Sequence, residues 1–359
     1  MWLKKLSEAA GVSGHEDEVR HIVIDIIADQ VDEYRVDSMG NVIALKKGDG
    51  SSKLRVMVAA HMDEVGFMIS HIEDNGLLRF FKVGGLDDRI LPAKVVWIGD
   101  KKVPGLIGFK PVHLTERNER NKPIKHQHLT IDIGASSKAE AEKLVQRGDY
   151  ATFATEFVEL DPDGESWRSV RGKAFDDRAG CAVLIELLNA QYPFDLYAVF
   201  TVQEEVGLRG ARVAAFAVEP DLAFALEGTG ANEIPTKKDV SPSTRLGHGP
   251  AITVMDRSFI ADKRLVRLLI DTAEELGIPY QIKQPGIGGT DAGAIHRTKE
   301  GVPSVTVAVP CRYIHSPAAI LSLDDFDHTV QLVRESLLRL GDEWLHGEIS
   351  HSDHSTFQP

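Results

Sequence analysis

The stretch LRVMVAAHMD, residues 54–63, is a run of apolar residues that ends abruptly at ionisable side chains. Its apolar part, residues 54–60, has the length and character of a strand buried in a sheet. His61 and Asp63 follow directly, and the two-residue alternation of an extended chain predicts that their side chains point the same way. The sequence therefore predicts a buried strand with a polar pair at its carboxyl end.

Three further apolar runs share this pattern. They are residues 196–202 before Glu204, 222–226 before Glu227 and 305–309 before His315. Helical patterns lie between or beside the runs, at residues 16–30, 179–190, 262–276 and 324–340. This alternation predicts an α/β fold, with a mixed, largely parallel sheet and helices on both faces.

Residues 67–163 break this rhythm. Short β-type runs at 77–83, 94–98, 103–109, 129–133 and 151–157 are separated by glycine-containing turns, with only one helical stretch near residues 138–147. We therefore expect a discontinuous main domain, residues 1–66 and 164–359, and an inserted small β-barrel-like domain, residues 67–163, whose exposed strand edges would suit dimerisation and assembly. The polar stretch 111–128 has no apolar period and predicts a loop.

Composition excludes several classes of protein. The formal net charge of -13 opposes binding to nucleic acid, and no apolar run approaches the roughly 18 residues of a membrane span. The only two cysteines, Cys181 and Cys311, are far apart, so we interpret both as buried thiols rather than a disulfide framework. With no visible export signal, these features favour a cytoplasmic protein without nucleic-acid or membrane partners.

The ionisable residues at the predicted strand ends have both structural and functional interpretations. In α/β sheets, ligands collect at the carboxyl ends of the strands. A histidine and an aspartate such as His61 and Asp63 can also form a purely structural pair. Asp176 and Asp177 precede a predicted helix, whose N-terminus they could stabilise. The neighbouring carboxylates of Glu204 and Glu205 repel each other unless a cation or a shared proton relieves them, although they could be surface acids.

Five of these residues make a chemically coherent set: His61, Asp176, Glu205, Glu227 and His315. Two divalent cations need imidazole and carboxylate ligands, with positions left open for water and substrate. One carboxylate must bridge the two ions, and Asp176 is the central candidate. The set predicts a site for two metal ions.

The motifs HMDE, AFDDRAG, QEEVGLRGA, ALEGT, GGTDAGAIH and RYIHSP, in this order, resemble the family of tetrahedral aminopeptidases, also known as deblocking or glutamyl aminopeptidases and sometimes labelled endoglucanases. The resemblance covers nearly the whole chain. It implies a zinc-exopeptidase-like catalytic domain that removes the N-terminal residue of peptides with a free N-terminus. It also implies a hollow tetrahedral dodecamer built from dimers.

The resemblance assigns roles to particular residues. His61 and Glu227 would hold one metal ion, and Glu205 and His315 would hold the other. Asp176 would bind both ions, which are usually zinc or cobalt. Glu204 would be the general base, Asp63 would orient His61, and the bond between Asp176 and Asp177 would be cis. Many relatives have aspartate where this chain has Glu227, which is a departure that could change metal preference.

Two other functions remain as alternatives. A glycoside hydrolase would use the paired acids Glu204 and Glu205 but would leave both histidines without a role. A catalytically silent scaffold would have no need of Glu204. The turn at residues 288–291 can be a helix-capping loop or a wall of the substrate pocket.

Overall fold

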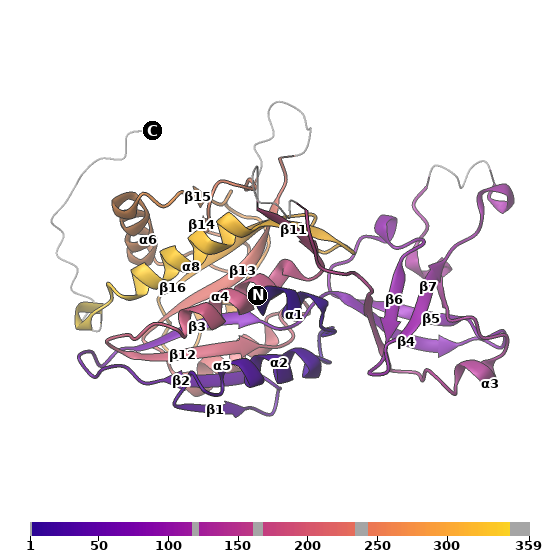
Figure 1. The fold of residues 1–359 in the computed structure, drawn as a ribbon, viewed down its shortest axis with the longest axis horizontal. Coiled ribbons are helices and arrows are strands. Elements are labelled where there is room, and N and C mark those ends of the chain that lie inside the picture. The colour runs from indigo at the N-terminus through magenta and orange to yellow at the C-terminus, as the bar shows by residue number, and fades with distance from the viewer. Residues whose placement is uncertain (1, 117–121, 161–167, 234–242, 345–359) are drawn as a thin grey trace.

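The computed structural model describes residues 2–116, 122–160, 168–233 and 243–344, which form an α/β body with a small β-barrel beside it (Figure 1). The body is built on an 11-stranded sheet in the order β1-β2-β12-β3-β13-β16-β17-β11-β10, with β14 pairing β15 and β16. Its strands are β1 (Glu33–Val36), β2 (Val42–Lys46), β3 (Arg55–His61), β10 (Val158–Glu159), β11 (Ser169–Gly172), β12 (Asp195–Thr201), β13 (Leu222–Ala231), β14 (Ala251–Thr253), β15 (Gln281–Ile282), β16 (Ser304–Arg312) and β17 (Ala319–Ser322).

The sheet is mixed, with its parallel part in the middle. Strands β12, β3, β13 and β16 run parallel to one another. The ladders of β1, β2, β17, β11 and β10 on either side are antiparallel. The predicted fold class is confirmed, and the four predicted buried strands are these four central ones.

Helices cover both faces of the sheet because its central strands are apolar on both sides. In β3, Val56 and Val58 belong to the larger core, whereas Met57 and Ala59 belong to a second core on the opposite face. The larger core is covered by α1 (Trp2–Glu8), α2 (Asp17–Ile27), α4 (Phe175–Leu187), α6 (Lys263–Leu276) and α8 (Leu323–Leu337). The opposite face is covered by α5 (Arg209–Val218) and α7 (Ala292–Ile295). Alternation along the strand thus divides the side chains between two cores.

The barrel closes in the order β4-β5-β8-β7-β6-β9. Its strands are β4 (Gly66–Ile72), β5 (Leu78–Val83), β6 (Val95–Ile98), β7 (Val103–Gly108), β8 (Thr130–Asp132) and β9 (Tyr150–Phe153), and one short helix, α3 (Lys138–Ala141), lies beside them. Phe67 packs edge-on against Phe80 and Phe153, with ring centroids 5.1 and 5.3 Å apart. The barrel therefore has an apolar core of its own.

The sequence did not predict every element. Strand β4 was missed, and its pairing with β5 is irregular between Ile69 and His71, which disturbs the simple alternation. Helix α5 was missed as well. The loop predicted at residues 111–128 contains short 3-10 turns at Val112–Leu114 and His126–His128, and residues 117–121 lie outside the described part. The barrel strands run from residue 66 to 153, and the predicted domain limits at 67 and 163 stay a prediction.

Within the described residues, no helix is both long and apolar enough to cross a membrane. Cys181 and Cys311 are both buried and form no disulfide. Their interpretation as buried thiols is confirmed.

Candidate metal centre

The five predicted metal-binding side chains meet at the carboxyl edge of the parallel strands. His61 ends β3, Glu205 follows β12, His315 follows β16 and Asp176 lies at the start of α4. Glu227 differs from the prediction, because β13 continues past it to Ala231.

Strand pairing explains the position of Glu227. β13 stays paired with β16 as far as Ala231, but its last pair with β3 is Ala225 with Ala59. Glu227 therefore lies where the neighbouring strand has moved away, and its carboxylate reaches His61.

Two groups of ligand atoms share Asp176. Nε2 of His61 lies 3.3 Å from Oδ1 of Asp176 and 3.4 Å from Oε2 of Glu227. Nε2 of His315 lies 3.2 Å from Oδ2 of Asp176 and 3.2 Å from Oε1 of Glu205. Each oxygen of Asp176 therefore faces a different histidine.

The spacing of these atoms fits cation binding. Two ligand atoms bound to one tetrahedral cation at about 2.1 Å are roughly 3.4 Å apart. The four histidine–carboxylate separations are 3.2 to 3.4 Å. Imidazole and carboxylate are also ligand types that zinc and similar ions accept. Among the described residues, two groupings are compact enough to hold a divalent cation: His61 with Asp177 and Glu227, and His61 with Asp176 and Glu205.

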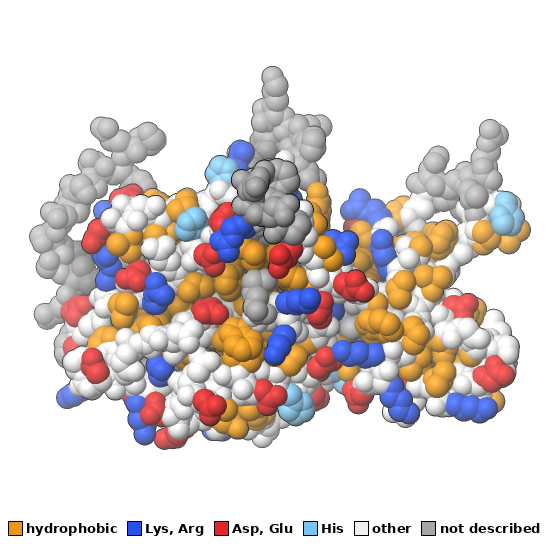
Figure 2. Space-filling model, viewed as in Figure 1, with side chains coloured by type: hydrophobic (Ala, Val, Ile, Leu, Met, Phe, Trp, Pro, Cys, Tyr) orange, Lys and Arg blue, Asp and Glu red, His pale blue; other side chains and the backbone are white. Residues whose placement is uncertain are grey.

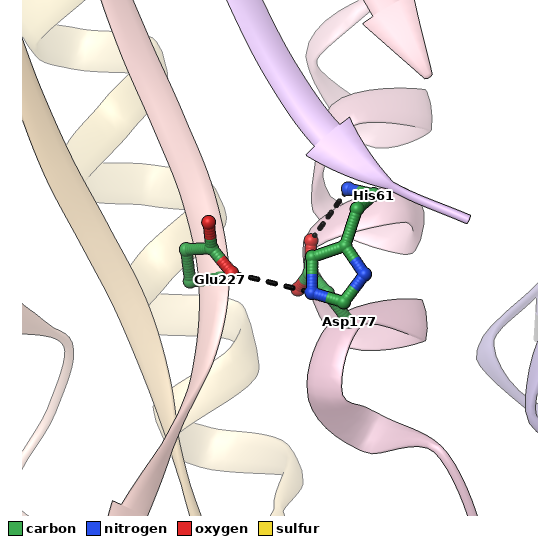
Figure 3. Close-up of side chains that lie close together, drawn as sticks. All are labelled: His61, Asp177 and Glu227. Carbon is green, nitrogen blue, oxygen red and sulfur yellow. Dashed lines mark hydrogen bonds and ion pairs between the residues drawn. The ribbon is translucent and has the colours of Figure 1, made fainter. Parts of the chain in front are cut away.

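Asp177 also lies near His61 and Glu227, as Figure 3 shows. Its two oxygens already accept hydrogen bonds from the backbone N–H groups of His61, at 3.1 Å, and Gly180, at 2.8 Å. The peptide bond between Asp176 and Asp177 is cis, as predicted. Asp177 thus ties the start of α4 to the end of β3, whereas both oxygens of Asp176 lie beside the histidines.

The site concentrates negative charge. Although burial acts to lower it, the pKa of His315 is raised to about 11 because Asp176 and Glu205 lie beside it. Burial also raises the pKa of Glu205 and of Glu227. Carboxylates packed this closely stay ionised only with positive charge among them, which a divalent cation supplies.

Asp63 contacts both His61 and the backbone of the paired glutamates. Its Oδ1 lies 3.4 Å from Nδ1 of His61, and its backbone oxygen lies 3.1 Å from the same nitrogen. Its carboxylate also accepts hydrogen bonds from the backbone N–H groups of Glu204, at 2.9 Å, and Glu205, at 3.1 Å, and from the hydroxyl of Ser13, at 2.6 Å. Asp63, the expected neighbour of His61, therefore also holds the backbone of Glu204 and Glu205 in place.

Glu204 belongs to neither group of ligand atoms. Its Oε2 lies 3.9 Å from Nε2 of His61, and 11% of its side chain is exposed. Burial, reinforced by the charges of Glu227 and Glu205, raises its pKa well above the ordinary value. This carboxylate is close to the candidate metal ligands and remains available to a substrate.

A cleft of about 450 Å³ opens over the candidate metal centre. Its lining includes Asp176, Glu204, Glu205, Glu227 and His315, together with Gly228–Gly230, Ser243, Lys283 and Ile287–Thr290. The turn at residues 288–291, singled out in the sequence, therefore does form part of a cleft wall. A cavity of about 570 Å³ lies on the far side of Gly207 and Leu208 and is lined by none of these carboxylates.

Sequence reasoning missed Glu16. This buried glutamate accepts hydrogen bonds from the backbone N–H groups of Gly14, at 2.7 Å, and Gln203, at 3.2 Å, and burial raises its pKa to about 7. It caps no helix with its side chain, although it directly precedes α2. Its place before a helical pattern made it look like an ordinary first-turn acid.

Glu64 was also missed, although it lies in the HMDE motif. Its carboxylate accepts hydrogen bonds from Lys173, at 2.6 Å, from Arg178, at 3.3 Å, and from the hydroxyl of Thr152 in β9, at 2.9 Å. Lys173 and Arg178 flank Asp176 in the sequence, so this buried cluster joins the barrel to the start of α4.

Asp291 holds the carboxylate of Glu227 through a hydrogen bond. Its backbone N–H donates a 3.1 Å hydrogen bond to Oε1 of Glu227, and its Oδ2 accepts a 2.5 Å hydrogen bond from the hydroxyl of Thr201. The residue lies in the GGTDAG motif, whose function the sequence left open.

Similar proteins give this geometry a context. A protein of Acetivibrio thermocellus assigned as an aminopeptidase is 42% identical over 93% of this chain and 97% of its own length. The lysyl aminopeptidase of Pyrococcus furiosus is 36% identical over 94% of this chain and 96% of its own. The glutamyl aminopeptidase of Lactococcus lactis is 33% identical over 95% and 96%.

Solved structures agree with these relatives. A TET aminopeptidase from the marine sediment archaeon Thaumarchaeota archaeon SCGC AB-539-E09 has a TM-score of 0.91 and 39% identity over 96% of this chain and 97% of its own. The Pyrococcus horikoshii TET1 peptidase, which can assemble into a tetrahedron or a large octahedral shell, has a TM-score of 0.82 and 38% identity over 94% and 99%. A Thermotoga maritima protein described as an endoglucanase has a TM-score of 0.78 and 38% identity over 96% and 98%.

The family model described as M42 glutamyl aminopeptidase matches residues 40–332, a range that contains every predicted site residue. The chain belongs to this M42 family of aminopeptidases.

Proposed function

We propose that the chain removes N-terminal residues from peptides by metal-assisted hydrolysis, with Glu204 as the general base. Membership of an aminopeptidase family makes it a hydrolase of peptide bonds. The observation that carries the proposed mechanism is the pair of histidine–carboxylate groups that share Asp176.

In this proposal, His61 and Glu227 hold one ion, Glu205 and His315 hold the other, and Asp176 contacts both. Divalent cations held there would supply Lewis acidity, which lowers the pKa of water and polarises a peptide carbonyl. Zinc or cobalt is our choice of metal, because both accept nitrogen and carboxylate ligands.

Glu204 would take a proton from the attacking water at its carboxylate and return it to the leaving amine. Its support is position: it lines the cleft, lies outside both ligand groups and is held through its backbone by Asp63. Asp63 would orient His61, since it lies beside Nδ1 and leaves Nε2 directed at the carboxylates. An N-terminal amine is a cation, and the carboxylate of Glu227 is suited to attract it.

We further infer that the barrel mediates assembly into a tetrahedral dodecamer of dimers. On its outer surface, Val95 of β6 pairs with Leu106 of β7, and Trp97 pairs with Pro104. Val95, Trp97 and Leu106 are 36 to 49% exposed. Figure 2 shows hydrophobic side chains gathered on the barrel. Exposed apolar area of this kind is typical of an interface, and a relative forms a tetrahedron. A cytoplasmic location agrees with the two unpaired cysteines.

A glycoside hydrolase is the second candidate, because one similar structure is described as an endoglucanase. Hydrolysis of aminoacyl-anilides and of carboxymethyl cellulose should be measured on the same enzyme before chelation, after chelation, and after zinc or cobalt is restored. Anilide hydrolysis that is lost and then recovered, with no cellulose turnover, is the expected result. Cellulose turnover, or anilide turnover that survives complete metal removal, would contradict the proposal.

A further inference from the structure

Lys283 is a buried cation that has no partner among the residues that the structure describes. It directly follows β15, only 6% of the residue is exposed, and it lines the cleft over the candidate metal centre. Its ammonium group makes no hydrogen bond or ion pair with any residue in the described part of the chain. Lysine is rarely buried unless it is paired, because removing an isolated charge from water is costly.

A comparison within the molecule shows how unusual this is. Lys173, also buried, donates to the carboxylate of Glu64 at 2.6 Å and to the backbone oxygen of Ala9 at 2.7 Å. Lys283 lacks both kinds of contact among the described residues, although it shares a cleft with several carboxylates. An anion that enters the cleft from solvent could pair with the ammonium group of Lys283.

The cleft that Lys283 lines has a volume of about 450 Å³, which is large enough for such an anion. Gly288 lies beside the ammonium group, and a Cβ at this position would lie 3.8 Å from Nζ. Its φ of 74° also disfavours a larger residue. On the same wall, the hydroxyl of Ser243 has no hydrogen-bond partner among the described residues. An ammonium and a hydroxyl together can bind a carboxylate.

The position of this wall indicates which carboxylate would bind. Gly288 begins the turn that ends at Asp291, whose backbone N–H holds Glu227. If Glu227 attracts the α-amino group of a peptide, the side chain of that same residue can extend along the turn toward Lys283.

We infer that Lys283 selects peptides whose N-terminal residue is aspartate or glutamate, by pairing with the side-chain carboxylate. The inference rests on the proposed aminopeptidase function. It goes beyond family membership, since one relative is a lysyl and another a glutamyl aminopeptidase.

The test compares kcat/KM for the 4-nitroanilides of glutamate, aspartate, leucine and lysine, using the metal-loaded enzyme. The native enzyme should prefer the acidic substrates. Lys283→Met should lower the ratio of glutamyl to leucyl hydrolysis by about 10²-fold, the effect of losing a hydrogen bond between charged groups. Lys263→Met, which changes an exposed lysine at the start of α6, should leave the ratio unchanged. Metal content and thermal midpoints should be measured for each variant.

Three results would overturn the inference. The native enzyme could cleave leucyl-anilide at least as well as glutamyl-anilide. Lys283→Met could lower all rates equally, with metal and fold intact. In the third, Lys283→Met would lower only the rate at which Leu-Gly is hydrolysed and would leave that of Leu-Gly-amide unchanged. Lys283 would then bind the C-terminal carboxylate of the peptide. In each of these cases the proposed function stands, whereas a metal-loaded native enzyme that cleaves no anilide would refute the proposed function itself.

Discussion

The backbone N–H of Glu204 donates a 2.9 Å hydrogen bond to the side-chain carboxylate of Asp63. The same carboxylate lies 3.4 Å from Nδ1 of His61, so one buried acid sets the position of a candidate metal ligand and of the proposed base. The backbone of Glu204 and the imidazole of His61 are therefore held at a set distance from each other by the fold.

Glu204→Gln should retain two metal ions and the native fold while its kcat falls by about 10²–10⁴-fold, the usual contribution of a positioned acid or base. The reason is that glutamine keeps the shape of the side chain but cannot accept a proton. Metal analysis and anilide kinetics on the same sample check both parts. Glu205→Gln is the matched control and should lose metal. Near-native turnover, or loss of metal, in the Glu204 variant would show that Glu204 is not the base.

Asp176→Ala should release both ions, because each oxygen of this carboxylate faces a different group of ligand atoms. Inductively coupled plasma mass spectrometry after gel filtration gives the number of ions per chain. Glu227→Ala and Glu205→Ala, which each remove a ligand from one group, should weaken mainly one ion. Two ions retained by the Asp176 variant would disprove the bridging role.

Glu16 should make the native protein less stable as the pH rises. Its pKa is about 7 in the fold against 4.5 for the free side chain, so the folded state binds the proton more tightly. Stability from this group is present below about pH 4.5 and is lost as the pH rises to about 7. Relative to the native chain, Glu16→Gln should gain roughly 1–3 kcal/mol in the free energy of unfolding between pH 5 and pH 8.

Urea denaturation of the metal-free proteins at several pH values measures this difference and excludes pH-dependent metal binding. Asp17→Asn, at a side chain that is 72% exposed, is the neighbouring control for the removal of one negative charge at the start of α2. A difference between Glu16→Gln and the native chain that stays constant from pH 5 to pH 8 would be evidence against a buried, proton-binding Glu16.

Leu106→Asp should reduce the assembly to dimers or monomers, because it places a charge in the exposed apolar surface of β6 and β7. The native chain should have about twelve times the 39.4 kDa mass of one subunit in light scattering. Phe216→Asp is the control: Phe216 is 65% exposed but lies on α5, away from the barrel. A native mass of one or two subunits, or a Leu106 variant of undiminished mass, would refute the assembly proposal.

The sequence by itself determined the four central strands, the helices that alternate with them, the β-rich insertion and the set of ionisable residues at the strand ends. These follow from local patterns, because apolar runs and their polar ends record which residues are buried and where each strand leaves the sheet. The resemblance then assigned roles to the same residues.

Only the tertiary structure showed how the surroundings of the two adjacent aspartates differ. Asp176 was already the predicted bridging residue, but the sequence did not predict that its carboxylate lies between two imidazoles while that of Asp177 accepts backbone N–H groups. The same holds for Glu16, Glu64 and Lys283, whose surroundings come from segments far away in the chain. A side chain's partners depend on long-range packing, and no local pattern contains the distance between residues that meet only after folding.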